Sequence, residues 1–74
     1  MKIIENVKKV KLELFKDVKL NNNQYAFLGK IDDEFYLKIK DYSGKCLNTW
    51  IYGGYKRLST INKYARCYGI EFYE

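Results

Sequence analysis

Two adjacent stretches, residues 35–42 and 46–52, carry the clearest alternation of hydrophobic and polar positions in the chain. From Phe35 to Ile39 every second side chain is large and hydrophobic, and the side chains between them are aromatic or basic. A period of two is typical of a strand that turns one side inward and the other toward solvent. Residues 43–45 suit a three-residue hairpin loop whose second or third residue has a positive φ. The pattern therefore predicts a β-hairpin around which the chain is organised.

The length of that loop decides which side chains share a face. A three-residue loop pairs rings and ammonium groups across the hairpin, Lys38 with Trp50 and Tyr36 with Tyr52. Leu37 then faces Ile51, so one face is hydrophobic and the other is basic and aromatic. A two-residue loop instead pairs Leu37 with Trp50 and moves the rings into the core. We favour the first register.

Three more stretches have the composition of strands, residues 10–15, 25–31 and 70–73. The segment before them, residues 2–9, has a short helical or irregular pattern. Residues 21–23 are three asparagines and predict a loop, because Asn tolerates the left-handed region and its side chain binds nearby backbone groups.

The second of these strands, residues 25–31, leads into an acidic turn at residues 32–34. A three-residue turn there pairs Phe27 with Ile39 and places Tyr25, Phe27 and Ile31 on the hydrophobic face. The turn itself is expected to be a polar hairpin tip rather than a metal site, since no fuller set of oxygen ligands accompanies it.

Residues 60–68 carry the clearest helical pattern. One face is built from residues spaced i, i+3, i+4 and i+7, namely Ile61, Tyr64, Ala65 and Tyr68. Ser59 or Thr60 suits the N-cap, and Gly69 suits a left-handed C-cap. The opposite face shows Asn62, Lys63 and Arg66.

Together these elements predict an α+β fold: an antiparallel β-meander of four to five strands, with one amphipathic helix near the C-terminus packed on the sheet. The chain has 74 residues. A chain of this length buries roughly 60% of its unfolded surface, which predicts a single domain over residues 1–74.

The distribution of charge indicates the chemistry of a partner. The chain carries 14 basic and 9 acidic side chains, a net charge of +5, and residues 38–74 hold seven of the basic and three of the acidic ones. Such asymmetry favours a polyanionic partner. An AT-rich coding sequence produces a similar Lys-, Asn-, Ile- and Tyr-rich composition, so this alternative stays open.

The lack of histidine and the wide spacing of the cysteines limit which catalytic and metal sites the chain can form. The chain has no histidine, and its two cysteines, Cys46 and Cys67, lie far apart in sequence. A zinc site lacks its usual ligands, and catalysis by a histidine base is excluded. We expect free thiols, no cofactor and no metal.

Rings and cations on one sheet face are the arrangement that binds single-stranded nucleic acid, by stacking on bases and neutralising phosphates. The candidate contact residues are Tyr36, Lys38, Lys40, Trp50 and Tyr52 on the sheet, with Lys56, Arg57, Lys63 and Arg66 at its edge. The favoured function is therefore a small non-enzymatic binding protein that contacts nucleic acid, with single strands or RNA preferred, or a nucleoprotein complex. A Tyr or Lys stem that merely covers apolar sheet surface is the ordinary alternative.

Two other functions fit the same composition. Tyr, Trp and Arg dominate protein-protein hot spots, so the patch also suits an inhibitor of a nucleic-acid-handling protein. In size, AT-rich composition and lack of a catalytic set the chain resembles accessory proteins of bacteriophages and mobile elements, some of which, including anti-CRISPR proteins, block nucleases. A small basic ribonuclease toxin is the third hypothesis, through residue types found at Lys56, Arg57, Tyr64, Arg66 and Tyr68.

The remaining expectations concern location and assembly. The chain shows no apolar run near 18 residues, and charges interrupt its first ten residues. We therefore expect a cytoplasmic protein with no membrane contact. A free edge strand in so small a fold allows either a monomer or a homodimer.

Overall fold

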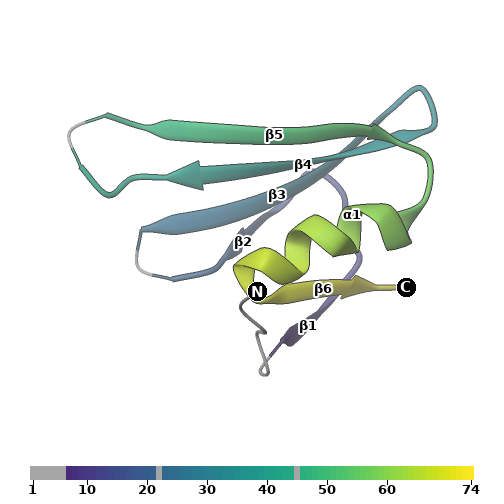
Figure 1. Cartoon of the computed structure of the whole chain (residues 1–74), viewed down its shortest axis with the longest axis horizontal. Helices are drawn as coiled ribbons and strands as arrows, with labels where there is room; N and C mark the ends of the chain where they lie inside the picture. The colour runs from purple at the N-terminus through teal and green to yellow at the C-terminus, as the bar shows by residue number, and fades with distance from the viewer. Residues whose placement is uncertain (1–6, 22, 45) are drawn as a thin grey trace.

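A four-stranded antiparallel sheet is the largest element of the computed structural model, which describes residues 7–21, 23–44 and 46–74 (Figure 1). Its strands lie in chain order, β2 (Asp17–Lys19), β3 (Gln24–Ile31), β4 (Glu34–Asp41) and β5 (Asn48–Tyr55). After β5 come the helix α1 (Leu58–Ala65) and a 3₁₀ turn, η1 (Arg66–Tyr68). The predicted α+β meander with one helix near the C-terminus packed on the sheet is confirmed.

A second, smaller sheet was not predicted. It is a parallel pair formed by β1 (Lys8–Lys11) and β6 (Ile70–Tyr73). The strand expected at residues 10–15 is wrong in its bounds, because the chain turns at Leu14 and Phe15, and Phe15 has a φ of 61°. Of the segment 2–9 expected to be helical or irregular, Lys8 and Lys9 belong to β1, and residues 1–6 lie outside the described residues.

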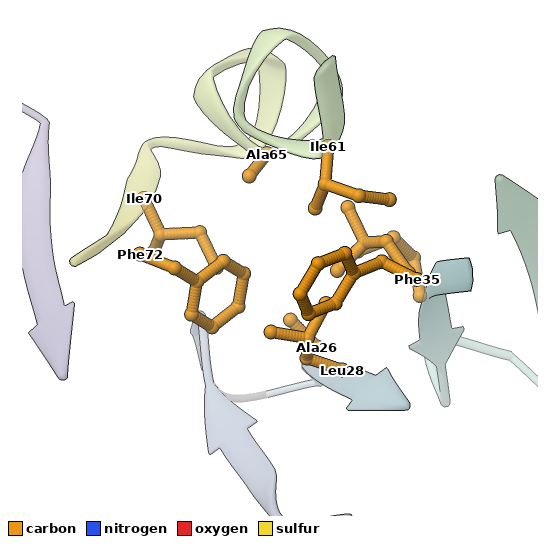
Figure 2. Close-up of a cluster of buried hydrophobic side chains, with 9 residues drawn as sticks. Ala26, Leu28, Phe35, Ile61, Ala65, Ile70 and Phe72 are labelled. Atoms are coloured by element: carbon orange, nitrogen blue, oxygen red, sulfur yellow. The ribbon is translucent and has the colours of Figure 1, made fainter. Parts of the chain in front are cut away.

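The hydrophobic core lies between the four-stranded sheet on one side and α1 and β6 on the other (Figure 2). It is made of nine buried side chains from β3, β4, α1 and β6: Ala26, Leu28, Phe35, Leu37, Ile39, Ile61, Ala65, Ile70 and Phe72. In Figure 1, α1 and the β1–β6 pair lie on the same side of the sheet. One face of the sheet is therefore covered and the opposite face is open.

The register between β3 and β4 corrects the predicted one. Leu28 pairs with Leu37 and Ala26 with Ile39, so Ala26 and Leu28 are core residues while Phe27 points to the open face. The loop has two residues, Asp32 and Asp33, with φ values of 48° and 70°. Two successive positive φ values match the twist of a tight hairpin, and Asp tolerates them. The one-residue difference in loop length moved every side chain of β3 to the other face.

The register between β4 and β5 is also different from both of the predicted alternatives. Trp50 lies opposite Ile39, and Tyr52 lies opposite Leu37. The loop is longer than three residues, since β4 ends at Asp41 and β5 begins at Asn48. At its start the Asp41 carboxylate accepts hydrogen bonds from the Ser43 N–H (2.7 Å) and hydroxyl (2.5 Å). The rings of β5 therefore lie on the covered side, and Ile51 lies on the open side. Lys45 lies outside the described residues.

The helix confirms the predicted apolar face and corrects its ends. Ile61 and Ala65 are buried, and Gly69 ends η1 with a φ of 82° in the left-handed region. The N-cap position is Arg57, without a side-chain hydrogen bond, so neither Ser59 nor Thr60 caps the helix.

Asn62, which was expected on the solvent side of the helix, is buried. Its side-chain amide donates to the Phe72 carbonyl (3.0 Å), and its carbonyl accepts the Phe72 N–H (2.9 Å). The helix thereby holds β6 by satisfying the backbone groups that β1 does not use.

Candidate binding face of the sheet

The open face of the four-stranded sheet can be read as rows of side chains that lie opposite one another on neighbouring strands. One row crosses Lys19, Tyr25, Lys40 and Thr49, and the next crosses Asp17, Phe27, Lys38 and Ile51. A third row places Tyr36 between Gly29 and Gly53. Because directly opposed residues share a face, rings and lysines alternate across this surface. We call it the open face.

The rings on the open face touch one another in two groups. Phe27 lies with its ring centroid 6.2 Å from that of Phe15 and 6.3 Å from that of Tyr36. Tyr25 makes an edge-to-face contact with Tyr42 at 5.9 Å. Phe15 is 58% exposed and Tyr42 49% exposed. These two rings therefore present aromatic surface to solvent at the side of the sheet.

Phe15 has a backbone conformation that is uncommon for its type. Its φ of 61° lies in the left-handed region, which bulky side chains rarely adopt. The Phe15 N–H donates to the Leu28 carbonyl at 2.8 Å, which fixes the turn against β3. The backbone of Phe15 is therefore strained, and in this conformation its ring reaches the open face.

The lysines of the open face gather at the end farther from the β3–β4 turn. Lys40 lies over the Phe27 ring, 5.3 Å from its centroid, and its ammonium is 3.1 Å from an Asp17 oxygen. Among the ion pairs of the described residues, none includes Lys19 or Lys38. This half of the open face therefore offers two ammonium groups beside Tyr25 and Phe27.

The opposite end of the open face is apolar and acidic. Ile31, Tyr36 and Ile51 line a hollow of about 380 Å³ together with Glu34 and Asp32 from the hairpin end. Carboxylates repel phosphates, so this end suits an apolar or basic group rather than a polyanion.

Of the predicted sheet residues, the structure brings Tyr36, Lys38 and Lys40 together on the open face and separates them from Trp50 and Tyr52. Trp50 lies on the covered side of β5 and is 45% exposed. The predicted arrangement with Trp50 beside Lys38 is therefore wrong, because the register differs by one residue.

Tyr52 belongs to a cluster of four tyrosines between β5 and the helical segment. Its ring stacks on Tyr64 at 4.9 Å, and Tyr55 stacks on the same ring at 5.4 Å. The Tyr52 and Tyr68 hydroxyls are hydrogen-bonded at 2.7 Å. Burial, and then this hydrogen bond, raise the pKa of Tyr68 above its ordinary value of 10. The four rings are half-buried and pack against one another on the covered side of the sheet.

The predicted edge residues lie around the helix rather than beside the open face. Lys56 and Arg57 are exposed where β5 leads into α1, and Lys63 is exposed on the helix. Arg66 is paired with Glu71, which also pairs with Lys9 on β1. Since α1 covers the other side of the sheet, Lys63 and Arg66 do not share a surface with Lys38.

The hydrophobic pattern of the sequence did not identify five open-face residues: Phe15, Lys19, Tyr25, Phe27 and Tyr42. Both faces of β3 carry bulky apolar side chains, so the alternation along the strand does not show that Tyr25 and Phe27 lie on the open face. The paired Asp residues before Glu34 were the available signal for a two-residue turn, and that turn length would have placed Phe27 on the open face.

The described residues offer no group of three or more cysteines and carboxylates placed to hold a metal ion. Both thiols, Cys46 and Cys67, are exposed and unbonded to one another. Within the same described residues, no helix combines the length and the apolar character that crossing a bilayer requires.

Comparison of the chain with protein-family models, with curated proteins and with solved structures gave no significant match. The geometry of the open face therefore carries the functional argument by itself.

Proposed function

We propose that the chain is a non-enzymatic binding protein whose open face contacts single-stranded nucleic acid. The observation that supports this most directly is the row of Lys19, Tyr25 and Lys40, with Phe27 and Lys38 in the next row. Rings stack on bases of any sequence, and ammonium groups neutralise the phosphates between them. The open face combines both groups at the spacing of neighbouring strands.

The position of each side chain on the open face assigns it a contact with a base or with a phosphate. Phe15 and Tyr42 offer the exposed rings for stacking, and Tyr25 and Phe27 form the floor between them. The ammonium groups of Lys19 and Lys38 contact the phosphates, while that of Lys40 also forms an ion pair with Asp17. The Glu34 carboxylate at the acidic end of the open face repels phosphates, so the nucleic-acid strand is expected to lie toward the lysine end.

The test compares two double variants that each remove two positive charges. Lys19→Gln/Lys38→Gln changes the open face, and Lys56→Gln/Lys63→Gln changes exposed lysines near the helix. Binding of fluorescein-labelled oligouridylate and oligothymidylate of equal length is followed by anisotropy at several salt concentrations. The first variant is expected to bind about 5- to 30-fold more weakly, for losses of about 0.5–1 kcal/mol per exposed ion pair.

The salt dependence separates specific contact from general attraction. The slope of the logarithm of the binding constant against the logarithm of the salt concentration is expected to flatten by about 0.7 for each lysine that contacts a phosphate. It should flatten in the Lys19/Lys38 variant and remain that of the unmodified chain in the Lys56/Lys63 variant. Equal losses in the two variants would contradict the assignment to the open face, and absence of binding at low salt would contradict the function.

The acidic hollow supports a second candidate, docking of a basic segment of a nucleic-acid-handling protein. Ile31, Tyr36 and Ile51 provide an apolar floor, and Asp32 and Glu34 provide the complementary charge. A Lys- and Arg-rich peptide with one apolar anchor is then expected to shift the amide NMR signals of Ile31 and Ile51. If such a peptide shifts neither signal, this candidate is wrong.

A further inference from the structure

The free edges of the two sheets differ in how they are protected against pairing with another strand. An unpaired strand edge offers a row of backbone N–H and C=O groups, and natural proteins shorten, charge or cover such edges. β2 is three residues long and carries Asp17 and Lys19. β1 reads KKVK, with three lysines in four residues. The edge of β6 away from β1 is occupied by the Asn62 side chain.

The remaining edge, β5, is neither short, charged nor covered among the described residues, and its bulge lies at one end. It is eight residues long, and its sequence NTWIYGGY contains no ionisable group other than tyrosine and no proline. It pairs with β4 on one side, and Figure 1 shows no other element beyond it. A register shift next to Gly53 and the positive φ of Gly54 (85°) form a bulge there, beyond which Tyr55 pairs with Phe35. A straight, uncharged edge therefore runs from Asn48 to Gly53.

The side chains of this edge are also apolar and exposed. Ile51 is 64% exposed on the open side, and Trp50 is 45% exposed on the covered side. Both are large, and they lie on adjacent positions of the same edge strand. Apolar side chains on both faces of an uncharged edge are a surface for another strand.

We propose that β5 pairs antiparallel with β5 of a second copy of this chain, about a two-fold axis through Ile51. Such a pairing is isologous, so each copy supplies the same strand to the other. Ile51 then faces Ile51 of the second copy on the open side, and Trp50 faces Tyr52 on the covered side. Aromatic and β-branched residues in these positions stabilise cross-strand contacts.

The distribution of charge selects β5 as the edge at which two copies can meet. The whole chain is basic, with a net charge of +5, and two copies would repel if a lysine-rich edge met its twin. β5 is the uncharged strand of the sheet, so the backbones can approach without opposing ammonium groups. A two-fold axis normal to the sheet leaves both open faces on the same side, as one continuous eight-stranded surface.

The test is the mass in solution, with two matched substitutions. The unmodified chain is expected to sediment with twice the 8.9 kDa of one chain as concentration rises. Ile51→Lys places like charges at the axis and is expected to halve that mass. Tyr73→Lys is the control, because Tyr73 is also exposed (48%) but lies on β6, outside the four-stranded sheet; it should remain dimeric. Circular dichroism checks that both variants are folded.

Disulfide trapping tests the register. In a chain with Cys46→Ser and Cys67→Ser, Ile51→Cys brings two thiols to opposed positions, about 4.5–5.5 Å apart at Cβ, and oxidation should link them. Thr49→Cys is the control, since its twin lies four residues away along the strand, about 13 Å, and should not link. A monomer at all concentrations, a dimeric Ile51→Lys variant, or a link at residue 49 in place of 51 would each overturn the proposal. None of these readouts uses nucleic acid, so failure here is distinct from failure of the proposed function.

Discussion

The ring of Tyr36 on β4 lies across Gly29 on β3, in the space that a Cβ at Gly29 would occupy. The two residues are directly opposed in the ladder. A glycine inside a strand weakens it by roughly 0.5–1 kcal/mol relative to alanine. Here the neighbouring ring covers the exposed backbone, so the glycine and the tyrosine form one packing unit on the open face.

This relationship predicts a change of sign in a double-mutant cycle. Gly29→Ala alone should destabilise the fold by about 1 kcal/mol, because the new methyl displaces the Tyr36 ring. In a Tyr36→Ala background the same substitution should stabilise by about 0.5–1 kcal/mol, since the space is then free. Urea unfolding of the four proteins measures the coupling. Equal effects of Gly29→Ala in both backgrounds would show that the ring does not depend on Gly29.

A second prediction concerns the attachment of the small sheet. Asn62→Ala leaves the N–H and C=O of Phe72 without their side-chain partner in a buried place. Each unsatisfied buried group costs about 1–3 kcal/mol, so a loss of about 2–6 kcal/mol is expected from urea unfolding. Amide exchange of β6 and β1 should accelerate more than that of β3 and β4. Asn48→Ala, at an exposed position, is the control, and a similar loss there would contradict the special role of Asn62.

The tyrosine cluster predicts a stability that falls in alkali. The hydrogen bond with Tyr64, and then burial, raise the pKa of Tyr55, while burial comes first for Tyr68. A raised pKa means that folding favours the neutral phenol. The resulting stability is complete below the ordinary value of 10 and is lost as pH rises through the higher folded values.

Urea unfolding at pH 8 and pH 11 tests this. The fall in unfolding free energy between the two pH values should be smaller in Tyr68→Phe than in the unmodified chain. Tyr73→Phe, which changes an exposed tyrosine on β6, should leave the fall unchanged. The same fall in all three proteins would mean that Tyr68 does not contribute to the alkaline loss.

Phe15 provides a test that separates binding from stability. Phe15→Gly relieves the left-handed strain, worth about 1–2 kcal/mol, but removes a partly exposed ring. The unfolding free energy should therefore change by less than about 1 kcal/mol. Oligonucleotide affinity should fall about fivefold or more, since stacking of one base is worth about 1–3 kcal/mol. Tyr73→Ala is the aromatic control, and its affinity should equal that of the unmodified chain.

The sequence and structure agree where local pattern is sufficient. The alternation in residues 35–42 and the helical spacing of Ile61 and Ala65 located β4 and α1. The chain is rich in aromatic residues on both faces of its strands, so hydrophobicity alone does not reveal which face of β3 or β5 is inward. That choice depends on loop length. The two-residue turn at Asp32 sets the inward face of β3, and the longer loop after Asp41 sets that of β5.

The pairing of β1 with β6 had no local signal. Lys8 pairs with Ile70, more than sixty positions away, and β1 is mostly lysine. Its lysines point outward while Val10 packs against the core. The same non-local arrangement explains why Asn62 is buried, because the partner of its side chain is the backbone of β6.

The measurement that tests the central claim most directly is an aromatic NMR titration with a short oligouridylate, because rings on the two sides of the sheet report separately. Contact through the open face predicts shifts of the Phe15, Tyr25 and Tyr42 ring signals, and unchanged signals from Tyr64 and Tyr68 in the cluster. Shifts confined to Trp50 and the tyrosine cluster would place the contact on the covered side and contradict the account.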